Sequence, residues 1–439
     1  MLLTRLIVSA LFALLLWTPP LAAADELVDQ LSTIPGITVV AEHTAPAGFR
    51  FFVLSYEQQV NHLLAWKGTF AQRVTLLHRS LAAPMIVNTA GYNISLAPSL
   101  SEPTQLVDGN ELTIEHRFFL PSRPEPADWQ DLTIFQAATD HHRIIQALKS
   151  LYQGRWLTTG RSKGGMAAVY HRRFYPDDVD GTIAYVAAND VVNQQDRYVA
   201  FLDAVGTDPD CRQRVKDFQR EALLRRNEIV PLMHAAAASQ GLTYSILGSA
   251  ERALEFHVID WAFGFWQLGG QAFCGLIPSS AASTPVFYGA LDLVFGFAFY
   301  TDQSLLELVP AAYQAATQLG YPTLPEGHLS DLLLFPGEDV PRSFVPAEIP
   351  LARFDQSAMR DIDIFVRLFG TRLMFVNGGN DPWSAEPFTL GPRTVDSFAY
   401  RVPGANHSAR IAQLPVEQQA EAIAAIRRWA GVETAASGQ

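Results

Sequence analysis

The chain has 439 residues, of which 49% are hydrophobic and 17% are charged. This composition supplies a sizeable core for one large domain or two smaller ones, and it argues against long disordered tails. The formal net charge is -12 and no run of basic residues occurs. A nucleic-acid partner is therefore not expected, because phosphate binding needs clustered Lys and Arg.

Residues 1–24 have the layout of a secretory signal peptide. One positive charge precedes an apolar run at 6–17, which is too short to span a bilayer, and small alanines follow at 22–24. An uncleaved membrane anchor is the alternative, whereas a bacterial lipid anchor would need a cysteine after the run. We therefore expect a secreted protein, extracellular or periplasmic, that is cleaved near Ala24 and does not associate with the membrane afterwards.

Residues 25–190 are expected to form the first part of a core domain in which strands alternate with helices. Short apolar or alternating runs bounded by turn residues predict strands at 51–55, 74–78, 84–87, 112–119, 155–159 and 181–187. Apolar residues at helical spacing predict helices at 133–152 and 166–175. Strands that alternate with helices imply a mostly parallel sheet covered on both faces.

Residues 191–350 differ in character and are interpreted as an inserted, mainly helical cap. Residues 208–240 read as amphipathic helix, and 256–300 are dense in aromatic residues and glycine. The chain has two cysteines, Cys211 and Cys274, and both fall in this segment. In an exported protein they can form one disulfide, although two buried free thiols remain an alternative.

Residues 351–439 return to the first pattern and complete the core domain. Helices are predicted at 355–369 and 416–429, and strands at 372–377 and 397–402. Each of these strands is followed by a loop rich in glycine and proline. In open α/β sheets, the loops after the strands gather the active site.

The strongest chemical signal is the sequence TGRSKGG at residues 159–165, which joins a predicted strand to a predicted helix. In that setting G-x-S-x-G is a nucleophile elbow, with Ser162 held on a tight, strained turn. Gly160 and Gly164 lack side chains, which lets the strand and the helix approach closely. A glycine-rich turn with a capping serine is the alternative. The elbow and the parallel sheet together predict an α/β-hydrolase fold with an inserted helical cap.

A serine nucleophile needs a base and an orienting acid, and in this fold they follow it in the order acid, then His. Asp381 comes just after one predicted strand and His407 just after the next, so both occupy loop tips beyond the elbow. Asp190 is the main rival to Asp381, and we interpret it instead as a cap of the first helix in the insertion. The predicted catalytic residues are Ser162, Asp381 and His407.

Two amide groups are expected to bind the oxyanion. The amide of Lys163 begins the helix after the nucleophile, where the helix dipole favours negative charge. A second donor should come from the loop after an early strand, where the amide of Gly91 or of Tyr92 is suitable. The sequence contains no H-E-x-x-H motif, cysteine cluster, phosphate loop or dinucleotide fingerprint, so we expect neither a metal nor a cofactor.

Residues 159–166 and the segment 170–181 resemble peptidase family S37, the secreted bacterial tripeptidyl aminopeptidases related to the S28 family of lysosomal prolyl carboxypeptidase. The likeness runs through the whole mature chain. Residues 377–383 and 404–407 resemble the family's acid and base segments, and 115–119 resembles the strand ahead of the elbow. The resemblance implies a peptidase that releases short peptides, and specifically tripeptides, from free N-termini. It places the triad on the same three residues.

An enzyme of this kind must recognise the ammonium group of its peptide substrate, which requires a carboxylate near the pocket. Glu115 and Asp190 are candidate substrate-binding residues, together with Asp260 and Asp292 of the cap. For Glu115 the alternative is a structural ion pair with Arg117. A secreted lipase or esterase with the same triad and an apolar, lidded pocket is the rival enzyme, and a hydrolase-fold binding protein is the rival without catalysis.

Overall fold

The computed structural model describes residues 25–191 and 196–432, so the predicted signal peptide lies outside the described residues. Within them the core is a nine-stranded sheet with the order β1-β2-β3-β5-β4-β6-β7-β8-β9. The strands are β1 Ile37–His43, β2 Arg50–Gln59, β3 Thr69–His78, β4 Met85–Thr89, β5 Asn110–Ile114, β6 Trp156–Arg161, β7 Gly181–Tyr185, β8 Leu373–Gly378 and β9 Phe398–Val402.

The sheet is antiparallel from β1 to β5 and parallel from β5 through β4, β6, β7 and β8 to β9. The interior strand β7 is buried along its whole length, as expected of a parallel strand covered on both faces. Because β6, β8 and β9 run in the same direction, the loops after them emerge at one edge of the sheet. The mostly parallel sheet predicted from the sequence is confirmed for this half.

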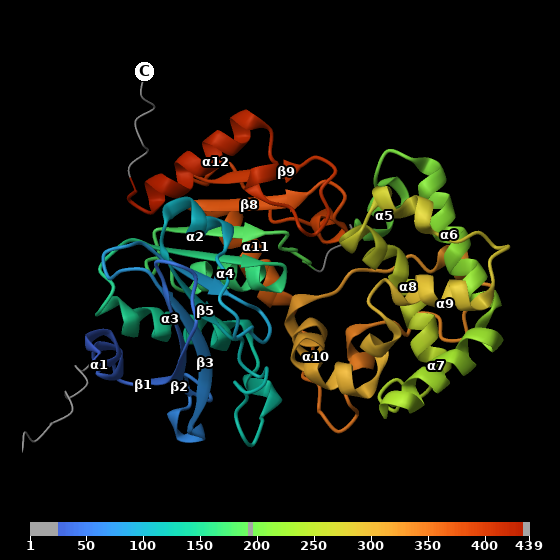
Figure 1. Cartoon of the computed structure of the whole chain (residues 1–439), viewed down its shortest axis with the longest axis horizontal. Coiled ribbons are helices and arrows are strands. Elements are labelled where there is room, and N and C mark those ends of the chain that lie inside the picture. The colour runs from blue at the N-terminus through green and yellow to red at the C-terminus, as the bar shows by residue number, and fades with distance from the viewer. Residues whose placement is uncertain (1–24, 192–195, 433–439) are drawn as a thin grey trace, which may run out of the picture.

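Helices cover both faces of the sheet (Figure 1). One face carries α1 Glu26–Ser32, α3 Ile134–Lys149, α4 Lys163–Phe174 and α11 Gln356–Phe369, and the other carries α2 Glu102–Val107 and α12 Val416–Trp429. In α11, Asp355 caps the first turn by accepting a hydrogen bond from the Ser357 amide, and the buried positions recur at helical spacing. This arrangement, with the helical insertion between β7 and β8, is the predicted α/β-hydrolase fold.

Besides shifts in strand bounds, the structure differs from the predicted strands in two places. Strand β1 at Ile37–His43 was not predicted; it pairs with β2 at the antiparallel edge of the sheet. The strand predicted at 112–119 ends at Ile114. Beyond it, Phe118 has a φ of 71°, a left-handed conformation that a strand does not accommodate.

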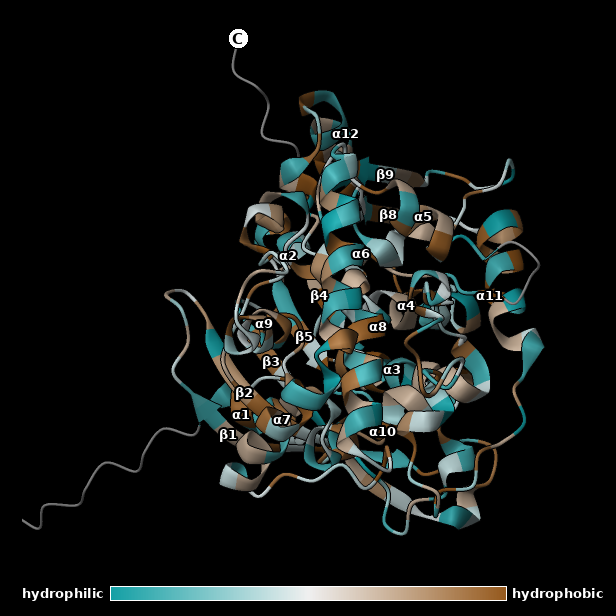
Figure 2. Ribbon diagram, turned by 90° about the vertical axis from the view of Figure 1, so that its right-hand side faces the viewer, coloured by the Kyte–Doolittle hydropathy of each residue, from teal (hydrophilic) through white to brown (hydrophobic). Residues whose placement is uncertain are grey.

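The insertion is a separate helical layer beside the core (Figure 1). It contains α5 Tyr198–Ala204, α6 Pro209–Leu224, α7 Arg226–Gln240, α8 Ala250–Leu268, α9 Thr284–Asp292 and α10 Asp302–Gln314. The single helix expected at 208–240 is two helices that meet at Arg225. Helix α8 is buried over most of its length, behind the hydrophilic outer face of α6 (Figure 2). No helix of the described residues is long and apolar enough to cross a membrane.

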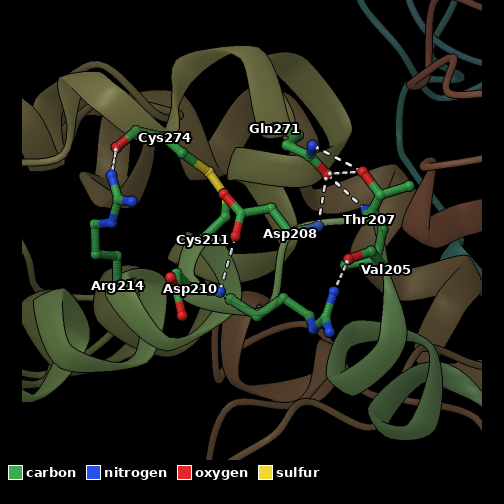
Figure 3. Close-up of a disulfide and its surroundings, with 9 residues drawn as sticks. Val205, Thr207, Asp208, Asp210, Cys211, Arg214, Gln271 and Cys274 are labelled. Carbon is green, nitrogen blue, oxygen red and sulfur yellow. Dashed lines mark hydrogen bonds between the residues drawn. A yellow bond between two sulfur atoms is a disulfide. The ribbon is translucent and has the colours of Figure 1, made fainter.

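The two cysteines form a disulfide inside the cap (Figure 3). Cys211 lies on α6 and Cys274 on a short 3-10 helix, Gln271–Leu276, and their Cα atoms are 5.6 Å apart. The Gln271 side chain also accepts hydrogen bonds from the amides of Thr207 and Asp208. Both connections join α6 to the segment that follows α8.

Candidate active site

Ser162 occupies the turn between β6 and α4, with a φ of 56°. This left-handed conformation is strained for a residue with a side chain and is typical of a nucleophile elbow. A Cβ atom on Gly160 would collide with the Gly164 backbone, and one on Gly164 would collide with the Thr89 carbonyl. The two glycines therefore permit the close contact of strand, helix and β4 that the sequence predicted.

The first turn of α4 packs directly against the loop that follows β4. Gly91 has a φ of +77°, and a Cβ atom there would lie 2.5 Å from the Gly164 amide nitrogen. The buried Lys163 side chain donates a hydrogen bond of 2.7 Å to the Gly91 carbonyl. Burial lowers the pKa of this ammonium to about 7. Since the first amides of a helix have no acceptor within it, the Lys163 amide is free to bind an oxyanion beside this loop.

The side chain of Tyr92 lies within hydrogen-bonding reach of the Ser162 hydroxyl. Burial raises the pKa of Tyr92 to about 12, so the phenol stays protonated and can donate. The sequence analysis predicted a backbone amide of this loop as the second oxyanion donor and did not consider the Tyr92 phenol. The one signal that could have indicated the phenol was the presence of a tyrosine in the predicted oxyanion loop.

Asp381 and His407 form the predicted acid and base pair. Asp381 follows β8, is fully buried, and accepts a hydrogen bond at 3.0 Å from Nδ1 of His407. Its other oxygen accepts from the Ser384 hydroxyl at 2.7 Å, and the Trp383 amide donates to the first at 3.3 Å. These donors fix the carboxylate, which in turn fixes the tautomer and orientation of the imidazole.

Several contacts bring the His407 loop to the elbow. Arg161, the residue before the nucleophile, donates hydrogen bonds to the carbonyls of His407 at 2.7 Å and Ala409 at 3.1 Å. From the cap, the carbonyl of Gln267 accepts from the His407 amide at 3.1 Å, at the end of α8. Among the interactions of the described residues there is no Ser162–His407 hydrogen bond. Such contacts are often loose without substrate, and the complete triad stays a prediction.

A pocket of about 360 Å³ opens beside the nucleophile. Tyr92, Ser162 and Lys163 line it from the core, and Asp260 is the carboxylate of its lining within the described chain. Its other walls are mainly aromatic and aliphatic side chains, among them Phe263, Phe295, Phe299, Phe344 and Trp383. Other aromatic residues of the cap, such as Phe256 and Phe287, are instead fully buried in its core. The pocket size is typical of small-molecule and peptide sites.

The structure places the remaining candidate carboxylates in other surroundings. Glu115 is buried and is held by Arg73, the Ser122 hydroxyl and the Ile94 amide. Its partner is therefore not Arg117, which pairs with Asp140. These structural contacts leave Glu115 poorly suited to bind a substrate ammonium group. Asp292 is exposed and accepts from the Phe297 amide.

Asp190 does not cap the first cap helix. That helix, α5, begins at Tyr198, whose amide donates to Asp196. Asp190 lies against Gly320 and interacts with Asp196 and Glu386. Burial, followed by repulsion from those two carboxylates, raises its pKa to about 7.

Comparison with known proteins gives consistent matches. The sequence model of the PS-10 peptidase S37 family matches residues 21–439. A prolyl tri/tetrapeptidyl aminopeptidase from Streptomyces mobaraensis is 47% identical over 414 residues, which cover 94% of this chain and 86% of the relative.

Solved structures are similar only at low identity. VinJ is 14% identical with a TM-score of 0.36, covering 89% of this chain and 100% of its own. Rv0554 from Mycobacterium tuberculosis is 12% identical with a TM-score of 0.37, covering 87% and 100%. These likenesses add nothing to the fold, which follows from the sheet order and the elbow.

Proposed function

Because the chain belongs to the S37 family of peptidases, we propose that this serine peptidase releases peptides of three or four residues from free N-termini. The name of the relative further suggests that proline is part of the recognised sequence. The observation that carries the proposal is the Asp381–His407 pair in loops that contact the elbow of the strained Ser162, which lines a pocket of about 360 Å³.

The proposed reaction is acyl transfer through a covalent intermediate. His407 accepts the Ser162 proton as the hydroxyl attacks the peptide carbonyl, and then returns a proton to the leaving amine. Asp381 stabilises the imidazolium that forms. Water, activated by the same imidazole, hydrolyses the acyl-enzyme and frees the short peptide.

The oxyanion of the tetrahedral intermediate would be bound by donors from two elements. The Lys163 amide comes from α4, and an amide of the Gly91–Tyr92 loop or the Tyr92 phenol comes from the loop after β4. The Lys163 side chain fixes the Gly91 carbonyl, which keeps this loop at a constant position relative to the nucleophile. Donors held in place before the reaction stabilise developing charge without reorganisation.

We also propose that the protein is exported, with cleavage near Ala24. The apolar run at 6–17 supports this, as does a disulfide, a bond that persists in oxidising compartments. Protein purified from the medium or periplasm for the assay below should begin at or near Asp25 on N-terminal sequencing. A mature chain that begins well before that residue would contradict export by cleavage.

The test compares one peptide with a free and with an acetylated N-terminus, and reads the product lengths by mass spectrometry. We expect products of three or four residues from the free peptide and loss of most cleavage on acetylation. Ser162→Ala should lose activity by roughly three orders of magnitude or more, together with labelling by a fluorophosphonate. Ser150→Ala, at an exposed position after α3, is the matched control.

Two outcomes would contradict the proposal. Equal cleavage of the free and acetylated peptides would indicate an endopeptidase. Turnover of a nitrophenyl ester without cleavage of any peptide would indicate the lipase or esterase alternative, which the apolar walls of the pocket alone would suit.

A further inference from the structure

Two carboxylates of the cap are buried together, and neither forms an ion pair within the described part of the chain. Asp260 lies on α8 and lines the pocket that holds Ser162. Asp339 lies two residues before Pro341, which lines the same pocket. Each residue is only 6% exposed, and the charges of Asp260 and Asp339 repel one another.

The hydrogen bonds in this part of the chain leave the pair unsatisfied. Oδ2 of Asp260 accepts from the Tyr300 hydroxyl at 2.7 Å. Neither oxygen of Asp339 has a hydrogen-bond partner among the described residues. The basic side chain that acts on Asp339 is Arg252, and it forms its ion pair with Glu338 at 2.8 Å.

Burying an uncompensated carboxylate costs several kcal/mol, so such a group takes up a proton or finds a cation. Burial raises the pKa of Asp260 to about 7, and burial with repulsion from Asp260 raises the pKa of Asp339 well above its ordinary value. Two buried carboxylates that repel one another resist ionising together. One monovalent cationic group bound beside them would offset the charge that burial disfavours.

The shape and lining of the pocket specify what that group is attached to. Apart from Asp260, the pocket walls that the cap contributes are largely aromatic and aliphatic. Tyr321 also lines the pocket, and the charges of both carboxylates act on its hydroxyl. A free metal ion or a highly charged ligand does not suit such walls. A short, mostly apolar chain that carries one positive charge at its end does.

We propose that Asp260 binds the free α-ammonium group of the peptide substrate, with the buried Asp339 adding its negative charge to the site, while the acyl portion lies along the pocket to Ser162. This inference rests on the proposed aminopeptidase function and assigns its N-terminal recognition to two residues. A fixed anionic end would also limit product length, because a peptide can place its ammonium group on the pair and its scissile carbonyl at Ser162 only over a few residues.

The experiment measures kcat/KM for the free and the acetylated peptide with the wild-type protein, Asp260→Asn and Asp339→Asn. The ratio of the two kcat/KM values is the readout. General damage to the site would lower kcat/KM for both peptides and leave their ratio unchanged. We expect each variant to lower kcat/KM for the free peptide at least tenfold, mainly through KM, and to bring the ratio towards one. Asp331→Asn, an exposed cap carboxylate paired with Arg220, should keep the wild-type ratio.

Each asparagine removes an uncompensated buried charge, so both variants are expected to fold, and thermal melting checks this. If both fold and keep the wild-type ratio, the assignment is overturned while the aminopeptidase function stands. If the wild-type protein itself cleaves the two peptides equally, the proposed function fails first, and the ammonium site fails with it.

Discussion

At the scale of single residues, the phenol of Tyr92 is the group beside the nucleophile that the sequence did not reveal. Its neutral hydroxyl lies within hydrogen-bonding reach of Ser162. In the resting site it can hold the serine hydroxyl, and during the reaction it can donate to the oxyanion. Neither role can be read from a tyrosine in a loop, because both depend on how that loop folds against α4.

Tyr92→Phe tests this role with the smallest possible change. Removal of one oxyanion donor typically costs about 10²–10³ in kcat; because backbone amides remain here, we expect a loss of about tenfold or more with little change in KM. Steady-state kinetics on the free peptide measure it. Tyr400→Phe, on β9, which removes a hydroxyl bonded to Glu421 of α12, is the control. An unchanged kcat would show that the amides suffice and that the phenol only fills space.

The residues of the proposed triad could be placed from the sequence, whereas the groups around them could not. Ser162, Asp381 and His407 follow from the elbow motif, the chain order and loop placement, all of which are local features. Asp339 stands in a proline-rich loop with no motif around it, and it becomes notable only because it is buried near Asp260. The predicted cap role of Asp190 was wrong because α5 begins at Tyr198, well beyond Asp190, and the Tyr198 amide donates to Asp196.

At the scale of elements, the sequence predicted the strands and helices whose apolar periodicity is strong. The helices α3, α4, α11 and α12 match their predicted segments closely. The break at Arg225 was missed because the sequence has no glycine or proline there. The strand that begins at Asn110 was predicted to run too far. Phe118, which lies beyond its end in a left-handed conformation, is not one of the residue types that usually adopt that conformation.

The disulfide is an element-scale constraint, because it ties α6 to the segment that follows α8. It closes a loop with a sequence separation of 63 residues, for which the chain-entropy estimate is about 4 kcal/mol. We expect the double variant Cys211→Ala, Cys274→Ala to lose about 2–4 kcal/mol of unfolding free energy, measured by denaturant titration. A reductant should destabilise the wild-type protein and leave the double variant unchanged. Two titratable thiols in the native wild-type protein would contradict the bond.

At the scale of the whole molecule, the cap and the core share the catalytic machinery. The end of α8 holds the His407 loop through the carbonyl of Gln267, and the Trp383 indole donates to the Gln267 side chain at 3.0 Å. The cap thus supplies part of the pocket wall and also positions the proposed base. The sequence predicted an insertion but not this contact, since it joins segments far apart in the chain.

The junction of core and cap also carries an excess of negative charge, which should make stability depend on pH. Asp190 interacts there with Asp196 and Glu386, and its pKa is raised to about 7 from an ordinary value of 3.8. The folded protein therefore holds this proton more tightly than the unfolded chain does. Below the ordinary pKa both states are protonated and no penalty exists. As the pH rises from the ordinary pKa of 3.8 towards about 7, the wild-type protein loses stability. Above about pH 7 the loss stays constant.

Asp190→Asn removes the charge and with it this pH dependence. Relative to the wild-type protein, the variant should gain unfolding free energy between about pH 4 and pH 8, on the order of 1–3 kcal/mol. Urea denaturation of both proteins at the two pH values measures the difference, and the other titrating groups cancel in it. Glu307→Gln, at an exposed position on α10, is the control and should show no such trend. If the difference in unfolding free energy between the two proteins is the same at both pH values, Asp190 is not held protonated in the folded state. Its carboxylate would then be charged and in contact with solvent.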